Sequence, residues 1–399
     1  MQTNIHPELR QLESVQEAET ILRSCVHCGF CTATCPTYTL LGDELDGPRG
    51  RIYLIKNLLE ENTIDARSTE HLDRCLTCRA CETTCPSGVE YGRLLDIGRE
   101  LVVDRAGRPL RHRVLAILLR LIIPRSYLFK PLLKVGQFLR PIMPRVIRDK
   151  VPQRKPAISP VVNRNAHKKV VLLEGCVQSA ATPEVNNALR VLLADKGIEC
   201  LTVAQEGCCG ALDYHLSAHE QGRARMRQLI DQLQPYVSSI DHIVSSASGC
   251  GVTVKEYPDY LRQDPTYIAK SQQIADMTID VSELMHDLSF SCADVAVAVH
   301  EPCSLQHGQK ISGKVNDILQ RAGARLVEVK ESHLCCGSAG SYSILQPELS
   351  NQLKERKLAA LQQDKPEVIV TANIGCELHL QTAQVPVMHW VEFLHRYRA

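Results

Sequence analysis

One cysteine pattern occurs twice in this chain and constrains it more than any other feature. Three cysteines are separated by two residues each, a fourth follows after three further residues, and proline comes next. The first run is Cys25, Cys28, Cys31 and Cys35, and the second is Cys75, Cys78, Cys81 and Cys85. Three thiolates at this spacing can surround one face of a metal cluster from a single loop. Zinc sites usually take paired C-x2-C knuckles, so the runs favour iron–sulfur chemistry over zinc.

The spacing of both runs resembles that of bacterial ferredoxins with two [4Fe–4S] clusters. In that pattern the fourth cysteine of each run ligates the cluster of the other run. The resemblance implies one cluster on Cys25, Cys28, Cys31 and Cys85, and a second on Cys75, Cys78, Cys81 and Cys35. Because each run lends a ligand to the other, we expect two neighbouring clusters in a small helical domain that forms a short path for electrons.

The residues between the two runs predict a helix at 52–60, because apolar side chains recur there at helical spacing. Arg49 and Arg51 come just before it. They either offset the negative charge of thiolate-ligated clusters or lie on a solvated helix entry, and both interpretations stay open.

Cysteine is unusually frequent, with 18 in 399 residues. Residues 1–11 contain no apolar run like that of a secretory signal, so we expect a cytoplasmic chain whose thiols stay reduced. No run of 18 or more apolar residues occurs, which argues against a transmembrane helix. The net charge of +1 produces no overall field that would attract nucleic acid.

A strongly basic stretch follows the second run. Residues 105–155 contain 14 lysines or arginines and a single acid. Apolar residues are dense at 114–123 and recur as far as Val146 and Ile147, but no uninterrupted part is long enough to span a bilayer. Such a stretch either lies against an anionic membrane surface or a partner subunit, or packs on the chain's own core as a connector. Residues 152–167 are expected to be a polar linker with prolines.

The C-terminal part contains an internal repeat. In each copy a single cysteine is followed by a Cys-Cys-Gly triplet and then by another single cysteine. The copies comprise Cys176, Cys208, Cys209 and Cys250, and Cys303, Cys335, Cys336 and Cys376. The intervals are 32, 1 and 41 residues in the first copy and 32, 1 and 40 in the second, which indicates a duplication.

Strand-like and helix-like stretches alternate through both copies. The strand-like runs are 170–173, 200–203, 242–244, 295–299, 326–329 and 368–370, and the helix-like stretches include 183–196 and 314–322. This alternation predicts two similar α/β units whose cysteines gather at the carboxyl ends of the strands. Four thiols per unit suit an iron–sulfur cluster or a zinc ion, while a bond between adjacent cysteines would be strained. The predicted fold class is α+β overall, a small α-helical domain followed by duplicated α/β units.

The repeat resembles the cysteine-rich CCG domain of heterodisulfide reductase subunits and related oxidoreductases. In that family a longer pattern ends in C-x2-C and can hold a non-cubane cluster. Here Ala247 and Asn373 stand at the first position of that final pair. One thiol per repeat is therefore missing, and four candidate ligands remain in each.

The whole chain is similar to the iron–sulfur subunits of bacterial glycolate oxidases. The most specific stretches of the resemblance are 25–36, 41–51, 207–215 and 371–376. We expect four parts, which are a ferredoxin-like bis-[4Fe–4S] domain at 1–104, a basic amphipathic connector at 105–167, and CCG repeats at 168–289 and 290–399.

The resemblance implies a division of labour. FAD-bearing partner subunits would oxidise glycolate, with D-lactate as a plausible second substrate, and this chain would carry the electrons to a membrane acceptor such as quinone. No catalytic residue is expected on this chain, which would lie peripherally at the cytoplasmic side of the inner membrane. No G-x-G-x-x-G fingerprint follows a predicted strand, in agreement with a flavin bound elsewhere.

Other interpretations stay open at this stage. The chain can belong to a related D-lactate or glycerol-3-phosphate dehydrogenase, or to a disulfide reductase in which a CCG centre acts directly. The CCG units can also be zinc-stabilised docking modules. His215, His219 and His307 lie near cysteine motifs and either tune or ligate a centre or are ordinary polar histidines.

Overall fold

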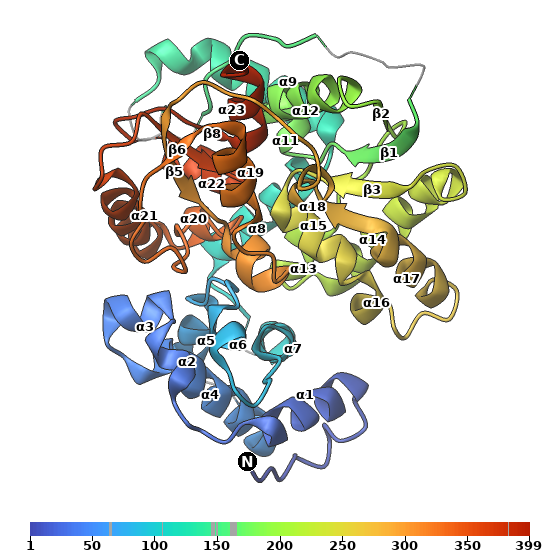
Figure 1. Cartoon of the computed structure of the whole chain (residues 1–399). Coiled ribbons are helices and arrows are strands. Elements are labelled where there is room, and N and C mark those ends of the chain that lie inside the picture. The colour runs from blue at the N-terminus through green and yellow to red at the C-terminus, as the bar shows by residue number, and fades with distance from the viewer. Residues whose placement is uncertain (64–65, 106, 145–147, 149–150, 160–165, 382) are drawn as a thin grey trace.

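The computed structural model describes residues 1–63, 66–105, 107–144, 148, 151–159, 166–381 and 383–399. A helical N-terminal part adjoins a larger body that contains two β-sheets (Figure 1). The N-terminus lies at the lower end of the view and the C-terminus at the top of the larger body. The predicted fold class, a helical domain followed by two α/β units, is confirmed.

The helical part is built from long helices that support short, cysteine-bearing ones. Its elements are α1 (Glu13–Ser24), α2 (Phe30–Ala33), α3 (Pro36–Leu41), η1 (Glu44–Asp46), α4 (Pro48–Glu61), α5 (Ala66–Asp73), α6 (Ala80–Thr84) and α7 (Tyr91–Arg105). Helix α4 covers the predicted helix at 52–60 and extends beyond both of its ends. Leu22, Ile55, Leu94 and Leu95 are fully buried between α1, α4 and α7. Burial of each contributes about 2 kcal/mol.

The basic connector is largely helical. It forms α8 (Leu110–Ile122), α9 (Ser126–Leu139) and the 3-10 turn η2 (Arg140–Ile142). Residues 152–159 form neither helix nor strand, as the linker prediction requires. Val146, Ile147 and linker residues 160–165 lie outside the described residues. Among the described helices, none is long and apolar enough to cross a membrane.

The two sheets of the larger body are parallel and have the same strand order. The first has the order β2-β1-β3-β4, with β1 (Lys168–Leu173), β2 (Ile198–Leu201), β3 (His242–Ser245) and β4 (Thr278–Asp280). The second has the order β6-β5-β7-β8, with β5 (Ala296–His300), β6 (Arg325–Leu326), β7 (Val368–Thr371) and β8 (Val387–His389). The identical order supports the duplication inferred from the cysteine spacing.

Helices pack around each sheet. In the first unit they are α11 (Gln178–Ala181), α12 (Pro183–Ala194), α13 (Ala211–His215), α14 (His219–Leu233), η3 (Gln234–Tyr236), α15 (Ser248–Lys255), α16 (Tyr257–Tyr260), α17 (Ile268–Met277) and α18 (Val281–Met285). In the second they are the π-helical turn η4 (Ser304–Gly308), α19 (Lys314–Ala322), α20 (Tyr342–Leu345), α21 (Pro347–Gln362), α22 (Ile374–Leu380) and α23 (Trp390–Arg396). One apolar cluster runs through both units and includes Leu172, Val244, Val297 and Trp390. The units therefore share a core.

Two strand predictions were too long at their C-terminal ends. The runs 200–203 and 326–329 continue beyond β2 and β6, which end at Leu201 and Leu326. Both are edge strands with a single neighbour, and their pairing stops at those residues. The chain then turns toward the Cys-Cys-Gly triplet of its unit.

Candidate metal centres

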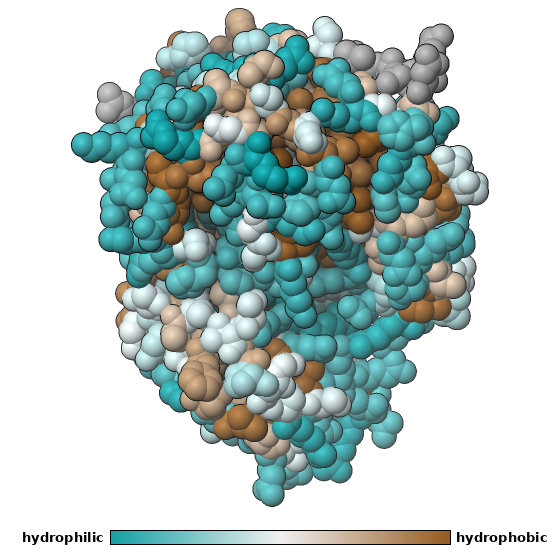
Figure 2. All heavy atoms as spheres, viewed as in Figure 1, coloured by the Kyte–Doolittle hydropathy of each residue, from teal (hydrophilic) through white to brown (hydrophobic). Residues whose placement is uncertain are grey.

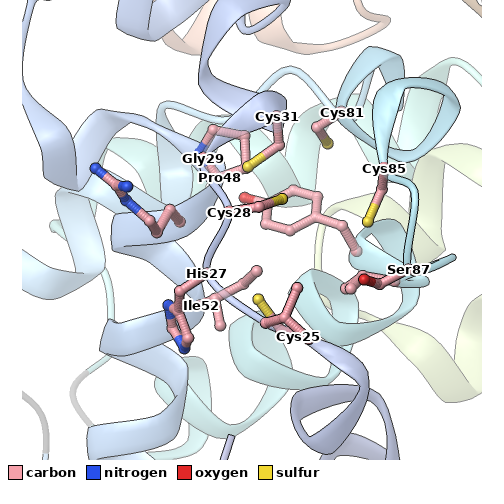
Figure 3. Close-up of a pocket in the computed structure, with 14 residues that line it drawn as sticks. Cys25, His27, Cys28, Gly29, Cys31, Pro48, Ile52, Cys81, Cys85 and Ser87 are labelled. Atoms are coloured by element: carbon pink, nitrogen blue, oxygen red, sulfur yellow. The ribbon is translucent and has the colours of Figure 1, made fainter.

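The structure brings Cys25, Cys28, Cys31 and Cys85 together around one pocket, called here the first cluster pocket. Figure 3 shows that these side chains surround the same space although Cys85 comes from the second cysteine run. Cys25 is buried whereas Cys28 is exposed, so the pocket opens to solvent beside Cys28. These are the four cysteines predicted to hold the first cluster.

A second cluster pocket is lined by Cys35, Cys75, Cys78 and Cys81. Cys35 reaches it from the first run, which mirrors the contribution of Cys85 to the other pocket. Cys81, Pro48 and Tyr91 line both pockets, so the two lie side by side. The exchange of one cysteine between runs is the arrangement predicted from the spacing, and ligation by these thiols stays a prediction.

The backbone of both runs adopts the same unusual conformation. His27 and Gly29 in the first run have φ values of 56° and 84°, and the equivalent Thr77 and Arg79 have 53° and 61°. Non-glycine residues adopt the left-handed region only where the surrounding structure imposes it. Turns of this kind gather backbone N–H groups around an anion, as in many iron–sulfur sites. Four converging thiols and these turns fit a [4Fe–4S] cluster in each pocket.

Several thiols of the two cluster pockets hold their protons more tightly than a free cysteine does. Burial raises the pKa of Cys31 to about 11, with the neighbouring cysteines adding to the shift. Burial also raises the pKa values of Cys78 and Cys81 well above the usual 9.0. Such thiols stay protonated at neutral pH unless a cation replaces the proton, so metal loading releases protons here.

Arg51 lies against the second cluster pocket. Its side chain is fully buried and its guanidinium donates to the His71 carbonyl at 2.7 Å and to Thr37 Oγ1 at 3.1 Å. Burial alone would lower the pKa of Arg51, but Cys75, Tyr91, Cys35 and Asp46 raise it overall. The interpretation as a solvated arginine is therefore wrong for Arg51, and its permanent charge lies in the wall of the second cluster pocket.

In the first CCG unit the predicted cysteines follow the strand ends. Cys176 lies after β1, Cys208 and Cys209 lie in the loop after β2, and Cys250 is in the first turn of α15. The sulfurs of Cys176 and Cys208 are 3.6 Å apart. Thiols this close can ligate one metal ion or neighbouring irons of one cluster.

The second unit repeats this arrangement. Cys303 follows β5, Cys335 and Cys336 lie before α20, and Cys376 is in the first turn of α22. The sulfurs of Cys303 and Cys335 are 3.8 Å apart. His300, which was not predicted from the sequence as a site residue, has a ring nitrogen within 4.8 Å of the sulfurs of both Cys336 and Cys376. The available signal in the sequence was its place directly after the predicted strand 295–299.

The glycine of each triplet is required by close packing. Gly210 and Gly337 both have φ of 88°. A Cβ atom at Gly210 would lie 2.7 Å from the Gly222 carbonyl oxygen, and one at Gly337 would lie 2.6 Å from the Ser350 carbonyl oxygen. Only glycine fits this left-handed turn against α14 in the first unit and α21 in the second.

The two positions that lack the expected cysteine lie where the units meet. Asn373 accepts a hydrogen bond from Gly249 N at 3.3 Å and its Nδ2 lies 3.7 Å from the sulfur of Cys376. Ala247 is buried beside Ile374. A contact between the units thus occupies the place of a fifth thiol in each.

The three histidines considered from the sequence have partners in the helical part. His215 Nδ1 lies 3.8 Å from Asp96, and His219 Nδ1 lies 3.0 Å from Glu100. His307 binds Thr83 through Nδ1 at 3.1 Å and the His333 carbonyl through Nε2 at 3.0 Å. These contacts join the helical part to the CCG units.

Family models and relatives agree with this architecture. A 4Fe–4S dicluster domain matches residues 21–89, and a cysteine-rich CCG domain matches 170–255 and 297–381. The chain is 48% identical to the glycolate oxidase iron–sulfur subunit of Escherichia coli, over 99% of both chains. It is 30% identical to a probable glycolate oxidase iron–sulfur subunit of Bacillus subtilis, over 92% of this chain and 90% of the relative.

A more distant relative is one of the subunits of the fumarate reductase (CoM/CoB) of Methanothermobacter marburgensis. It is 23% identical over 94% of this chain and 72% of the relative. The two glycolate oxidase relatives match nearly end to end, and both domain types are matched in this chain. The chain therefore belongs to the family of glycolate oxidase iron–sulfur subunits, which confirms the resemblance found in its sequence.

Proposed function

We propose that this chain is the electron-transfer subunit of a glycolate oxidase complex, which takes electrons from FAD-bearing partner subunits and delivers them to a membrane acceptor such as quinone. The observation that carries this proposal is the adjacency of cysteine sites. The two cluster pockets share Cys81, and the second pocket adjoins the second CCG unit.

The contact between the second pocket and the second CCG unit is apolar and direct. Leu76 and Cys78 of the helical part pack in one cluster with Cys303, Cys335 and Tyr342. The hydroxyl of Tyr342 donates to the Arg74 carbonyl at 3.0 Å. An ion pair between Arg79 and Glu256 fixes the helical part to the first unit as well. The first cluster pocket, the second cluster pocket and the cysteines of the second CCG unit are thereby held next to one another.

In this proposal each set of cysteines holds a metal centre. Cys25, Cys28, Cys31 and Cys85 hold one [4Fe–4S] cluster, and Cys75, Cys78, Cys81 and Cys35 hold the other. When bound, such clusters accept and donate single electrons. The four cysteines of each CCG unit hold a further metal centre. The chain then consists of an electron-carrying part at 1–104, a membrane-facing connector at 105–167, and CCG units at 168–289 and 290–399.

The exposed edge of the first cluster pocket suits a partner that delivers electrons. Cys28 is exposed there, and beside it Val26 and Phe30 are 67% and 61% exposed. Exposed apolar side chains next to a redox site favour docking of a partner protein. Glycolate is oxidised on that partner, since no nucleotide fingerprint marks this chain.

Helices α8 and α9 support contact with a membrane surface. Their exposed apolar side chains include Leu110, Tyr127, Leu132, Val135 and Phe138. Figure 2 shows a mostly hydrophilic face with separate hydrophobic patches over the upper body. The helices also carry the exposed basic residues Arg111, Arg113 and Lys134. Apolar and basic side chains together favour an anionic lipid surface.

A cysteine substitution tests the division of labour. Cys28→Ser, in the complex with the flavin subunits, is expected to abolish electron flow from glycolate to an external acceptor while glycolate still reduces the flavin. Cys200→Ser is the matched control, because Cys200 belongs to neither motif. Loss of flavin reduction in the Cys28→Ser complex would contradict the proposal.

Metal analysis tests the centres in the CCG units. About eight irons and eight sulfides per chain would account for the ferredoxin pair alone, and about sixteen would require a four-iron cluster in each CCG unit. Zinc in place of the additional iron would favour the docking-module interpretation for those units.

A further inference from the structure

His300 is a buried histidine beside two cysteines, and one of its ring nitrogens is unpaired among the described residues. It is the last residue of β5 and only 2% exposed. Its Nε2 has no hydrogen-bond partner among the described residues. A buried polar nitrogen without a partner costs about 1–3 kcal/mol, so such an atom calls for a ligand.

The surroundings of His300 supply the rest of a metal site. A ring nitrogen of His300 and the sulfurs of Cys336 and Cys376 all lie within 4.8 Å of one another. The three residues come from the end of β5, the Cys-Cys-Gly loop and the first turn of α22. Imidazole nitrogen and thiolate sulfur bind the same metals, at about 2.0–2.3 Å, so the three groups suit one metal centre.

Two other buried histidines of this unit have hydrogen-bond partners at both ring nitrogens. Both ring nitrogens of His307 are hydrogen-bonded, to Thr83 and to the His333 carbonyl. Both ring nitrogens of His389 are also engaged, by the Ser246 carbonyl and by Val391 N. His300 instead has an unpaired Nε2, and one of its ring nitrogens lies within 4.8 Å of the thiols.

The duplication gives a built-in comparison. Cys303 corresponds to Cys176, so His300 corresponds to Leu173 in the first unit. Leu173 is a buried apolar side chain that cannot bind metal. The two units therefore have different donor sets despite their common fold, and the one with the imidazole adjoins Cys78 of the second cluster pocket.

We propose that His300 is a nitrogen ligand of an iron–sulfur cluster in the second CCG unit, together with Cys336 and Cys376, and that the first unit has no such ligand. Imidazole in place of thiolate makes a cluster less negative and raises its reduction potential. That consequence, which would draw electrons from the second cluster pocket, rests on the proposed function, whereas the ligation itself does not.

The test uses the isolated full chain, reduced with dithionite, with its histidines labelled with ¹⁵N. Pulsed EPR is expected to show a strongly coupled nitrogen that changes from the ¹⁴N to the ¹⁵N pattern with labelling. His300→Leu, which copies the first unit, is expected to lose this coupling and keep the signals of the ferredoxin pair. His307→Gln is the control and is expected to keep the coupling.

Three outcomes would overturn the proposal. They are the absence of a strongly coupled histidine nitrogen from the wild-type protein, its persistence in His300→Leu, or zinc without additional iron in the second unit. The wild-type measurement stands even where His300→Leu fails to fold. Because partner subunits and glycolate take no part, failure here is distinct from failure of electron transfer from the flavin.

Discussion

At the scale of single residues, Arg51 joins separate segments beside the second cluster pocket. Its guanidinium binds the His71 carbonyl, Thr37 and Asp46 without access to solvent. Removal of a buried charge that is hydrogen-bonded and paired costs about 3–5 kcal/mol. We expect Arg51→Met to lower the free energy of unfolding by that amount and to reduce the iron content, as measured by anaerobic chemical denaturation and metal analysis.

Arg49 provides the matched control for Arg51. It pairs with Glu44 at 2.6 Å, but both side chains are more than one-third exposed. Exposed pairs contribute less than about 1 kcal/mol. Equal losses of stability in Arg49→Met and Arg51→Met would contradict the role assigned to the buried guanidinium.

His389 predicts a pH dependence of stability. Its Nδ1 accepts from Val391 N at 3.2 Å, so the proton lies on Nε2, which donates to the Ser246 carbonyl at 2.9 Å. Burial lowers the pKa of His389 from 6.5 to about 3. Between these values the unfolded chain binds a proton that the folded chain does not, so stability is lost as pH falls below 6.5.

The effect of His389 between pH 7 and pH 5 is about 2 kcal/mol, at 1.36 kcal/mol per pKa unit. His389→Gln can keep both hydrogen bonds and is expected to remove this part of the loss. Denaturation at the two pH values measures it, with His112→Gln on α8 as the control. The same pH dependence in wild type and His389→Gln would show that His389 is not responsible.

The cysteines could be predicted from the sequence because metal chemistry fixes both their type and their spacing. Metal chemistry and spacing did not predict the roles of Arg51, His300 and Asn373. Their contacts join distant segments, as between Asn373 and Gly249, which are 124 residues apart. Such pairings depend on the packing of whole units and leave no local pattern.

At the scale of elements, α8 and α9 combine exposed apolar and basic side chains, and their charges have different roles. Arg120 pairs with Asp213 at 3.0 Å, and Arg125 donates to the Leu121 carbonyl at 2.7 Å. These two arginines support the fold. Arg111, Arg113 and Lys134 are exposed and are the better candidates for contact with lipid.

Replacing Arg111, Arg113 and Lys134 together by Gln is expected to weaken binding to phosphatidylglycerol-containing vesicles roughly 100-fold, since each basic residue contributes about 1 kcal/mol. Leu132→Ser with Phe138→Ser is expected to weaken binding to the same vesicles by loss of apolar burial. Vesicle cosedimentation measures both, and Lys310→Gln with Lys365→Gln is the control. Unchanged binding in the first two variants would argue against a membrane-facing connector.

The strands and helices that were predicted from the sequence have strong apolar periodicity. The fully buried strands β5 and β7 and the amphipathic helix α19 are examples. The edge strand β6 was predicted too long, and β4 and β8 were not predicted. These strands have two or three residues each, which is too short for a distinct period.

At the scale of the whole molecule, the order of the parts could be predicted but their packing could not. Repeat spacing revealed the duplication, whereas the core shared by both units requires residues far apart in sequence, such as Leu172 and Trp390, to join one cluster. The apolar cluster that includes both Cys78 and Cys303 is equally non-local. This contact turns separate cysteine motifs into neighbouring sites.

The central claim is that this chain carries electrons delivered by partner subunits and does not oxidise glycolate itself. Anaerobic rapid mixing with glycolate, followed by freeze-quench EPR of the clusters, tests it most directly. The isolated chain, reducible by dithionite, is predicted to stay oxidised, whereas in the complex with the flavin subunits the flavin is reduced first and the clusters follow. Reduction of the isolated chain by glycolate, or clusters that stay oxidised beside a reduced flavin, would contradict the account.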